Sequence, residues 1–461
     1  MPELPEVETV RRLLKPTIVG QTFTGLVSLS PRQLDPAAPV MAKALKGRTI
    51  KDVQRRGKFL ILALDNGSHL VCHLRMEGKL FHLAKDYPWS DPHDRVIFTL
   101  ASGDKLIFND TRRFGRLWYY APEAELSCLS NLGPEATDLN PDYVYTKLRE
   151  ERRPIKEVLL DQSVFAGIGN IYADEICFAC HLNPFLPAKD IADLEQASAD
   201  IARESARILE LAIQSKGSTV RTYQAANHVK GSFQDLLKVY GRAGKPCTVC
   251  HTPICKRELK GRGTSFCPRC QGVPAILGIT GGIAAGKTTV CKILEARGFY
   301  YISTDEEAKR LYEDPKVVKI LSKIDPACFG KKGVDKDYLR RRLSEDKLFR
   351  RRWLTALYSA LKEKVIHMIN SQPDKPFTIE APLLFRAKMD TLCTRIIQVV
   401  TPDPLARLIE RGSKNPQAQM KLASTNDWER YTPQCDAIIA TDGPRELLQS
   451  KVDDCLKKLG I

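Results

Sequence analysis

The chain has 461 residues, of which 43% are hydrophobic and 27% are charged, a composition typical of globular domains. Its 28 glycines and 28 prolines follow no repeat, which excludes collagen-like and mucin-like classes. The longest uncharged stretch is shorter than the roughly 18 apolar residues of a membrane span, and the start, MPELPEVETV, lacks the pattern of a secretion signal. We therefore expect a cytoplasmic protein without a membrane partner.

Charge is unevenly distributed along the chain. The 71 Lys and Arg against 55 Asp and Glu give a net charge of +16. Residues 217–274 hold ten basic and two acidic side chains, and residues 275–461 hold 33 and 24, whereas residues 1–216 are nearly neutral. The excess in 217–274 is the footprint expected of a polyanion contact. Charge alone also allows an ordinary solvated surface.

Periodicity divides the chain into four blocks. Residues 1–130 read as mostly β, with a helix at 7–18 stopped by Pro16, a hairpin around Asn66-Gly67, and a second strand pair in KLIFNDTRRFGRLWYY at 105–120. Residues 131–216 have helical periodicity, and residues 217–274 are short, basic and cysteine-bearing. Residues 275–461 alternate strands with helices, including a helix between FTIEA at 377–381 and RIIQVV at 395–400. This alternation predicts a parallel α/β sheet.

Four of the 14 cysteines form a metal-ligand pattern. Cys247-x2-Cys250 and Cys267-x2-Cys270 have the spacing of a tetrahedral four-cysteine structural zinc site. The intervening KGRGTSF predicts a hairpin, and Cys255 is not expected to be a ligand. Cys177 and Cys180 also make a CxxC, but they lie in a predicted helix without a partner pair, so we interpret them as buried thiols.

The second residue is a candidate nucleophile. If Met1 is removed, Pro2 becomes the terminal amine, and an α-amino group titrates near 8 rather than near the 10.4 of lysine. A secondary amine that attacks a sugar C1′ gives an iminium directly, and Glu3 can supply the proton that this reaction requires. This role requires the Pro2 ring to be reachable from solvent. A proline at position 2 is common by chance, so on its own it does not indicate a nucleophile.

Five segments occur together in one order: PELPEVETV at 2–10, RRGKFL at 55–60, NDTRRFG at 109–115, AGIGNIYADE at 166–175 and the four cysteines. In this combination residues 1 to about 272 resemble formamidopyrimidine-DNA glycosylase, the bacterial enzyme that excises oxidised purines. The resemblance implies a β-sandwich domain, a helix–two-turn–helix domain with a zinc hairpin, and activity as a glycosylase and AP lyase. Its partner would be double-stranded DNA with oxidised purines (8-oxoguanine, formamidopyrimidines) or abasic sites.

The resemblance also implies roles for single residues. Pro2 would be the Schiff-base nucleophile, Glu3 the general acid/base, and Lys58 a further catalytic residue that binds the phosphate near the lesion. The DNA contacts would come from Lys58, Met76, Arg112, Phe114, Asn170 and Arg262. Of these, Met76, Arg112 and Phe114 would fill the gap left by the extruded nucleotide, although Met76 and Phe114 also suit a hairpin core. The segment GSTVRTYQ at 217–224 resembles the loop that caps the flipped base. Arg75, Glu77 and Thr111 depart from common family residues, which affects lesion preference more than chemistry.

A phosphate-binding loop opens the last block. ILGITGGIAAGKTTV follows an apolar strand and precedes a helix, the context in which GxxxxGK[ST] cradles nucleotide phosphates. Lys287 would meet the β/γ oxygens and Thr288 would reach Mg²⁺. The nucleotide-binding residues predicted in this loop are Gly281, Gly282, Ile283, Ala284, Ala285, Gly286, Lys287, Thr288 and Thr289.

Residues 276–461 resemble dephospho-coenzyme A kinase through this loop, FGKKGVDKDYL at 329–339, APLLF at 381–385, RLIERG at 407–412 and CDAIIATDG at 435–443. The resemblance implies ATP, Mg²⁺ and dephospho-CoA as ligands, with Asp305 taking the proton from the ribose 3′-hydroxyl and with Arg407 and Arg411 as lid arginines on ATP. Read alone, Asp305 equally suits a helix N-cap before EEAKRL. Ser303, Glu380, Arg386 and Tyr358-Ser359 depart from the family pattern.

We therefore predict a monomeric fusion of two enzymes, organised as 1–130, 131–216, 217–274 and 275–461. Two alternatives remain open. The protein could be a lesion-binding module whose kinase-like half only binds nucleotide, or that half could phosphorylate another small molecule.

Overall fold

A computed structural model describes residues 2–86, 91–218, 231–330, 333–372, 374–412, 415–417, 420 and 428–461. The chain divides into two compact units. Unit 1 comprises 1–254 and 264–271, and unit 2 comprises 255–263 and 272–461. Among the described residues, no helix combines the length and the apolar content needed to cross a membrane. Most of the predicted capping loop, 219–224, lies outside the described residues.

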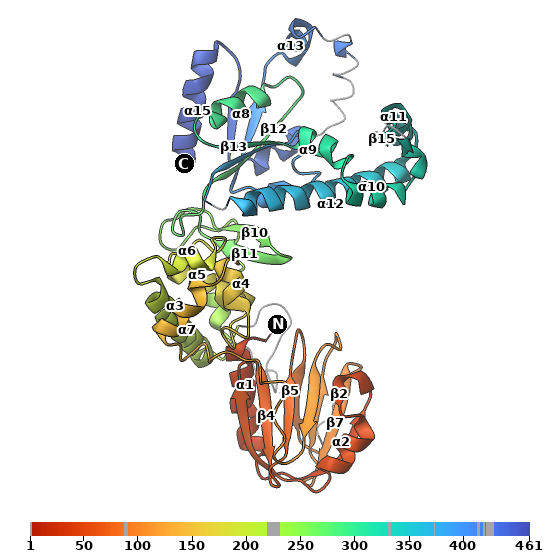
Figure 1. Cartoon of the computed structure of the whole chain (residues 1–461), viewed down its shortest axis with the longest axis vertical. Coiled ribbons are helices and arrows are strands. Elements are labelled where there is room, and N and C mark those ends of the chain that lie inside the picture. Colours follow the sequence, from red (N-terminus) through yellow and green to blue (C-terminus); the bar gives the residue numbers. More distant parts are fainter. Residues whose placement is uncertain are drawn as a thin grey trace. The chain divides into compact units, whose positions relative to one another are not determined.

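Unit 1 begins with two β-sheets (Figure 1). One sheet has the order β1-β7-β8-β6 and the other the order β2-β9-β5-β4-β3. A shared core of Val, Leu and Phe side chains joins these strands to α1 and α2. The elements are α1 (Leu4–Ile18), β1 (Phe23–Ser28), η1 (Pro31–Gln33), β2 (Leu34–Asp35), α2 (Ala38–Leu45), β3 (Ile50–Arg56), β4 (Phe59–Leu64), β5 (His69–His73), β6 (Lys79–Leu83), β7 (Asp94–Leu100), β8 (Lys105–Asn109) and β9 (Arg116–Tyr120). The predicted β-sandwich is confirmed.

The two predicted strand pairs have different outcomes. The hairpin around Asn66-Gly67 is confirmed, because β4 and β5 pair antiparallel with Leu62 opposite Leu70. The second pair is wrong. Strand β8 pairs with β6 and β7, whereas β9 pairs with β5 and β2 in the other sheet. The segment 110–115 therefore crosses from one sheet to the other. The alternation of apolar residues in 105–120 is the same for such a crossing as for a hairpin turn, so it could not distinguish the two.

The first helix also departs from its prediction. Helix α1 continues through Pro16 and ends at Ile18. A proline inside a helix removes one backbone donor and usually breaks the helix. Here the buried side chains of Val10, Leu14 and Ile18 keep the last turn packed in the sandwich core.

The rest of unit 1 is helical and ends in the cysteine-bearing segment. A second apolar core unites the helices with Leu4, Phe233 and Leu237. The elements are α3 (Pro141–Arg149), α4 (Ile155–Leu160), α5 (Asn170–Ala179), α6 (Ala188–Ala192), α7 (Ala197–Gln214) and η3 (Phe233–Asp235). The predicted hairpin around Lys260-Gly261 is formed by β10 (Cys255–Leu259), which is assigned to unit 2, and β11 (Arg262–Phe266).

Unit 2 is built on a parallel sheet with the order β13-β16-β12-β17-β18, which confirms the predicted α/β architecture. Helices α8 and α15 share one apolar core with Leu277 and Ile279, and α10 and α12 share another with Ile276 and Ile379. Helices therefore cover both faces of the sheet (Figure 1).

The elements of unit 2 are β12 (Ile276–Gly281), α8 (Lys287–Glu295), β13 (Tyr300–Ser303), α9 (Thr304–Leu311), α10 (Pro315–Ser322), η4 (Pro326–Cys328), β14 (Phe329–Gly330), β15 (Gly333–Val334), α11 (Lys336–Glu345), α12 (Lys347–Ser371), β16 (Phe377–Glu380), η5 (Asp390–Leu392), β17 (Arg395–Val400), α13 (Pro404–Glu410), η6 (Trp428–Gln434), β18 (Ala437–Ala440) and α15 (Arg445–Leu459). The helix predicted between β16 and β17 is absent, and turns with the short η5 connect these described strands instead.

Candidate active sites

The buried carboxyl of Glu3 joins the start of the chain to helix α5. Its Oε1 accepts a hydrogen bond from the amide of Ile171 at 2.9 Å and its Oε2 one from Tyr172 at 3.3 Å. The side chain is only 2% exposed. Burial raises the pKa of Glu3 to about 7, against the lowering effect of the Lys58 ammonium. A carboxyl that titrates near neutrality is suited to both donate and accept a proton.

Two glycines of AGIGN allow this approach. A Cβ on Gly169 would lie 2.2 Å from Cδ of Glu3, and a Cβ on Gly167 would lie 2.4 Å from Cδ1 of Leu4. Gly167 has a φ of +108°, which side chains rarely adopt. Its carbonyl accepts a hydrogen bond from the amide of Leu4 at 3.1 Å. Both glycines are therefore required by the close contact between α1 and α5.

Pro2 lies next to Glu3 and is buried. The solvent access that its predicted role requires is therefore not met in the chain that carries Met1. In this form the Pro2 nitrogen is also a tertiary amide, which has no nucleophilic lone pair. Removal of Met1 would convert that nitrogen into a secondary amine.

Lys58 and Asn170 lie near this carboxyl. Lys58 lies in the turn between β3 and β4 and is 4% exposed. Its Nζ donates to the carbonyl of Ile168 at 2.7 Å, in the AGIGN segment that directly precedes the Glu3 partners Ile171 and Tyr172. Asn170 is the half-buried first residue of α5. The structure therefore brings Pro2, Glu3, Lys58 and Asn170 to one place.

Sequence reasoning missed Glu6. This side chain accepts hydrogen bonds from the Glu3 amide at 2.9 Å, the Tyr172 hydroxyl at 2.8 Å and the Ser218 amide at 2.8 Å. It thereby ties α1 and α5 to the start of the predicted capping loop. Glu3 and Glu6 also form a reciprocal capping box at the start of α1. The three-residue spacing of Glu3 and Glu6, which is typical of a capping box, is the sequence signal that could have identified Glu6.

The crossing segment 110–115 presents Arg112 and Phe114 outward. Phe114 is 50% exposed, and the Arg112 guanidinium lies 4.8 Å from the centre of its ring. The fully buried Asp110 holds the turn, because its carboxylate accepts from the amides of Arg112 at 3.0 Å and Gly115 at 2.7 Å. Met76 is 38% exposed. None of the three side chains is a core residue, so the hairpin-core alternative for Met76 and Phe114 does not hold.

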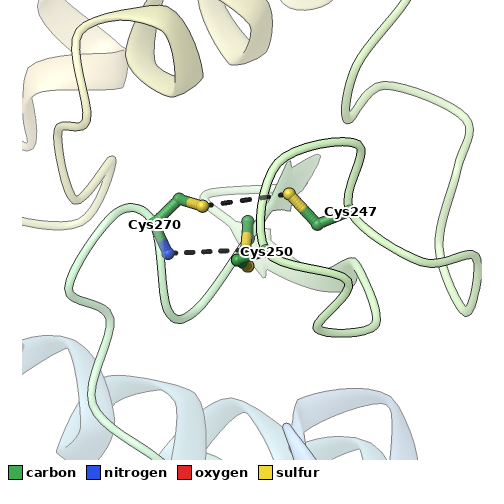
Figure 2. Close-up of side chains that lie close together, drawn as sticks. Cys247, Cys250 and Cys270 are labelled. Carbon is green, nitrogen blue, oxygen red and sulfur yellow. Dashed lines mark hydrogen bonds between the residues drawn. The ribbon is translucent and has the colours of Figure 1, made fainter.

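The four predicted zinc ligands meet in space. The Sγ atoms of Cys247, Cys250, Cys267 and Cys270 all lie within 4.8 Å of one another. The Sγ atoms of Cys247 and Cys270, which a dashed line joins in Figure 2, are 3.8 Å apart, and those of Cys250 and Cys267 are 3.4 Å apart. A tetrahedral zinc ion with Zn–S bonds of about 2.3 Å needs sulfur–sulfur edges of about 3.8 Å. The four thiols therefore fit a structural zinc ion.

Helix α5 also anchors the segments around this cluster. Asp174 forms a buried ion pair with Lys156 at 2.7 Å and accepts from the amide of Ser265 in β11 at 2.8 Å. Glu175 accepts from the amides of 238–240 at 2.8–2.9 Å. Asp174 and Glu175 thus fix the chain shortly before each of the two CxxC pairs. Arg262 is exposed at the start of β11, beside the hairpin turn. Cys177 is buried and Cys180 half-buried, both as free thiols.

In unit 2 the predicted phosphate loop joins β12 to α8. Gly281 has a φ of +143°, and a Cβ there would lie 2.1 Å from the carbonyl oxygen of Val399. Lys287 is 9% exposed, and its Nζ donates to the carbonyls of Gly281 at 3.2 Å and Gly282 at 2.9 Å. Burial lowers the pKa of Lys287, while the Glu380 and Asp305 carboxylates raise it. The ammonium is thus held at the mouth of the loop, where phosphate would arrive.

Glu380, at the end of β16, connects three elements around this loop. Its Oε1 accepts from the hydroxyl of Thr288 at 2.8 Å, and its Oε2 accepts from the hydroxyl of Tyr301. The Glu380 backbone carbonyl accepts from Thr304 at 2.8 Å. Thr288 and Glu380 together supply the oxygen ligands that Mg²⁺ prefers. The sequence marked Glu380 as a departure, and the pairing of parallel strands places it here.

Asp305 is the second residue of α9 and not its N-cap. The cap is Ser303, whose hydroxyl accepts from the amide of Glu306. Asp305 is exposed. Partial desolvation and the nearby Glu380 carboxylate raise its pKa. The N-cap alternative for Asp305 is therefore wrong, and its carboxyl faces the charges of the phosphate loop.

The two predicted lid arginines have different environments. Arg407 in α13 donates to the hydroxyl of Thr441 at 2.6 Å and to the Thr441 carbonyl. The same hydroxyl donates to the carbonyl of Ala285 in the phosphate loop at 2.7 Å. Thr441 belongs to the ATDG segment and was not singled out. Arg411, at the end of α13, is exposed, and its charge also contributes to lowering the pKa of Lys287.

Three family models match the chain. The formamidopyrimidine-DNA glycosylase N-terminal domain matches residues 1–117 and the formamidopyrimidine-DNA glycosylase H2TH domain matches 132–224. Dephospho-CoA kinase matches residues 275–445. The formamidopyrimidine-DNA glycosylases of Pediococcus pentosaceus and Bacillus cereus are 43% and 40% identical, and each match covers 59% of this chain and 99% of the relative.

Solved structures give the same result. A Lactococcus lactis Fpg variant in complex with DNA containing Fapy-dG is 37% identical, with a TM-score of 0.56, and the match covers 59% of this chain and 99% of that one. The MutM (Fpg) protein of Thermus thermophilus is 40% identical, with a TM-score of 0.54 over the same shares. The chain therefore belongs to the formamidopyrimidine-DNA glycosylase family and carries a dephospho-CoA kinase domain after its glycosylase part.

Proposed function

We propose that the glycosylase part removes oxidised purines from double-stranded DNA and cleaves the resulting abasic site, with Pro2 as nucleophile. The observation that supports this proposal most strongly is the pKa of the Glu3 carboxyl next to Pro2, which burial raises to about 7. After loss of Met1, the Pro2 nitrogen would bond to C1′ as the bond from C1′ to the base breaks. Glu3 would then donate the proton that this step requires, and the Schiff base would lead to strand cleavage by β,δ-elimination.

The DNA contacts of this proposal are Lys58, Met76, Arg112, Phe114, Asn170 and Arg262. The exposed pair of Arg112 and Phe114 supports it, because a guanidinium and an apolar wedge can offset the few kcal/mol that unstacking a base costs. The relatives solved with Fapy-dG or abasic-site DNA bind the same class of partner. The zinc ion would hold the Arg262 hairpin in shape.

Borohydride trapping tests this part. Full-length protein lacking Met1 should form a covalent adduct with lesion DNA after reduction of the iminium. Pro2→Gly should lose the adduct, because a primary amine on glycine lacks the pyrrolidine ring that places the nitrogen. If wild-type protein binds lesion DNA and never forms the adduct, the protein is a lesion-binding module.

We propose that the kinase domain transfers the γ-phosphoryl group of ATP to the ribose 3′-hydroxyl of dephospho-CoA. Asp305 would take the hydroxyl proton, and the 281–289 loop with Lys287 would hold the phosphates. Thr288 and Glu380 would hold Mg²⁺, which neutralises the developing phosphate charge. Arg407 and Arg411 would act as the lid arginines. The hydrogen bonds that Glu380 accepts from Thr288 and Tyr301 support a preformed site for Mg²⁺ at this loop.

A coupled assay tests this part. ATP consumption should depend on dephospho-CoA and be lost in Lys287→Ala. Turnover with another acceptor from a small-molecule panel would identify a different kinase, and ATP binding without turnover would identify a nucleotide-binding domain. The boundaries 1–130, 131–216, 217–274 and 275–461, a monomeric state and a cytoplasmic location belong to the same proposal. The location is supported by the 14 cysteines, none of which forms a disulfide.

A further inference from the structure

A strongly basic arm extends over α11 and the start of α12 in unit 2. Residues 336–352 contain eight Lys and Arg against three Asp and Glu. This is the densest cluster of arginines in the chain, with triplets at 340–342 and 350–352. None of these residues belongs to the phosphate loop, the Asp305 region or the lid.

The packing of α12 against the core leaves part of this positive charge exposed to solvent. The buried face of α12 is formed by Phe349, Trp353 and Leu357, at intervals of four residues. The positions between them therefore face away from the core, and Arg351 and Arg352 are exposed. Arg342 has a structural role instead, since it pairs with Asp325 at 3.3 Å and Asp346 at 3.4 Å.

Apart from Arg340, which pairs with Asp337 at 3.0 Å, the outward cations of the arm lack carboxylate partners. Within the described parts of the chain, no ion pair involves Arg341, Lys347, Arg350, Arg351 or Arg352. Arginines that serve protein stability are commonly neutralised by nearby carboxylates, as Arg342 is. A group of unneutralised guanidinium groups is instead suited to phosphate.

Two of these arginines, Arg351 and Arg352, border a groove between α10 and α12 of about 680 Å³. The polar residues Arg351, Arg352, Thr355 and Ser359 lie along one side of α12. The remaining lining is mostly apolar and comes from Ile320, Ile324, Leu348, Ala356 and Ala360, so the cations border an apolar floor. Guanidinium and hydroxyl groups are the side chains that contact the DNA backbone most often. Glu363 is the only carboxylate in the lining.

We propose that this arm (Lys336–Arg352 with the α10–α12 groove) binds the phosphate backbone of double-stranded DNA without regard to sequence. The kinase domain would then add a second DNA-contacting surface to the glycosylase. This inference rests on the proposed function in one respect, namely that DNA is the polyanion that the glycosylase part would bind. The charge complementarity favours a long polyanion, because the unpaired cations spread over two helices.

The test compares two double variants of the full-length protein. Arg351→Gln/Arg352→Gln removes two groove cations, and Lys457→Gln/Lys458→Gln removes two exposed lysines of α15 as a matched control. Affinity for a lesion-free duplex is measured at several salt concentrations. The groove variant should lose affinity, and its log K against log salt slope should fall by up to about 1.8, or 0.9 for each lost phosphate contact. The control slope should equal that of wild type.

A charge-preserving variant, Arg351→Lys/Arg352→Lys, separates lost contact from misfolding and should keep most of the wild-type slope. An unchanged slope in the Gln variant overturns the proposal. So does a raised KM for dephospho-CoA with unchanged DNA binding, which would assign the cations to the acceptor. Borohydride trapping on the same samples reports the glycosylase separately, so failure of the proposed function is recognised by loss of the adduct in wild type.

Discussion

The Glu3 carboxyl occupies the space that a side chain on Gly169 would need. The amides of Ile171 and Tyr172 at the start of α5 bind this carboxyl, and a Cβ on Gly169 would lie 2.2 Å from its Cδ and 2.5 Å from its Oε1. The glycine that precedes α5 therefore determines whether the carboxyl can reach the helix N-terminus at all.

Gly169→Ala should displace Glu3 and lower lesion excision by about 10²-fold or more, the usual contribution of a positioned acid/base group. Single-turnover excision rates measure this effect. Gly25→Ala is the matched control, because its Cβ would meet only Thr99, at an ordinary 3.7 Å. Wild-type rates in Gly169→Ala would show that Glu3 is not held for catalysis by this contact.

The pH dependence of stability should reveal the buried Glu3. Its pKa rises from 4.5 to about 7 on folding, so the folded state binds more protons than the unfolded state between these values. Stability from this group is therefore present below pH 4.5 and is lost as pH rises through 7. At one pKa unit per 1.36 kcal/mol, the loss is up to about 3 kcal/mol.

Glu3→Gln removes this titration. Relative to wild type, the variant should gain stability between pH 5 and pH 8, as measured by urea denaturation with proteolytic readout of the glycosylase unit. A wild-type-minus-variant difference that does not depend on pH would contradict the raised pKa.

The four-cysteine cluster should hold one zinc ion per chain by elemental analysis. Cys267→Ser should release the ion and weaken DNA binding, because the hairpin carrying Arg262 loses its support. Cys180→Ser is the control: it belongs to the other CxxC pair and lies outside the cluster, so it should keep its zinc. Full zinc occupancy in Cys267→Ser would remove this residue from the ligand set.

Asp305 and Glu306 provide a matched pair in the first turn of α9, since both are exposed and acidic. Asp305→Asn should lower phosphoryl transfer to dephospho-CoA by about 10²- to 10⁴-fold, the range for loss of a general base, and should retain ATP binding. Glu306→Gln should retain both, because within the described residues no hydrogen bond or ion pair joins its side chain to the phosphate loop. Equal effects of the two substitutions on transfer would exclude Asp305 as the specific base.

The sequence by itself determined the chemistry-bearing residues wherever a motif is contiguous. The two CxxC pairs, the glycines and lysine of 281–287, and PELPE each place donors within a few residues, so local geometry brings them together. The hairpin at Asn66-Gly67 follows for the same reason, because a short turn, here the three residues 65–67 with Gly67 at positive φ, fixes the register of its strands.

Contacts between distant segments required the tertiary structure. Glu6 accepts hydrogen bonds from Tyr172 in α5 and from Ser218, which lie 166 and 212 residues away in sequence. Only the folded chain brings these groups together. Glu380 reaches Thr288 because β16 lies next to β12 in a parallel sheet. The same limit explains the error at 105–120, since strands β8 and β9 have the alternation of a hairpin and yet join different sheets.

Packing also overrode local preference. Pro16 predicts the end of a helix, but burial of the apolar face of α1 keeps Leu14 and Ile18 in one helix. Asp305 is a good cap by residue type, but the backbone enters α9 two residues earlier, at Ser303. Residue type and spacing thus determine which chemistry the chain can perform, whereas the placement of strands and helices decides which carboxylates share a site, because electrostatic and hydrogen-bond interactions act over a few ångströms in space and are independent of separation along the chain.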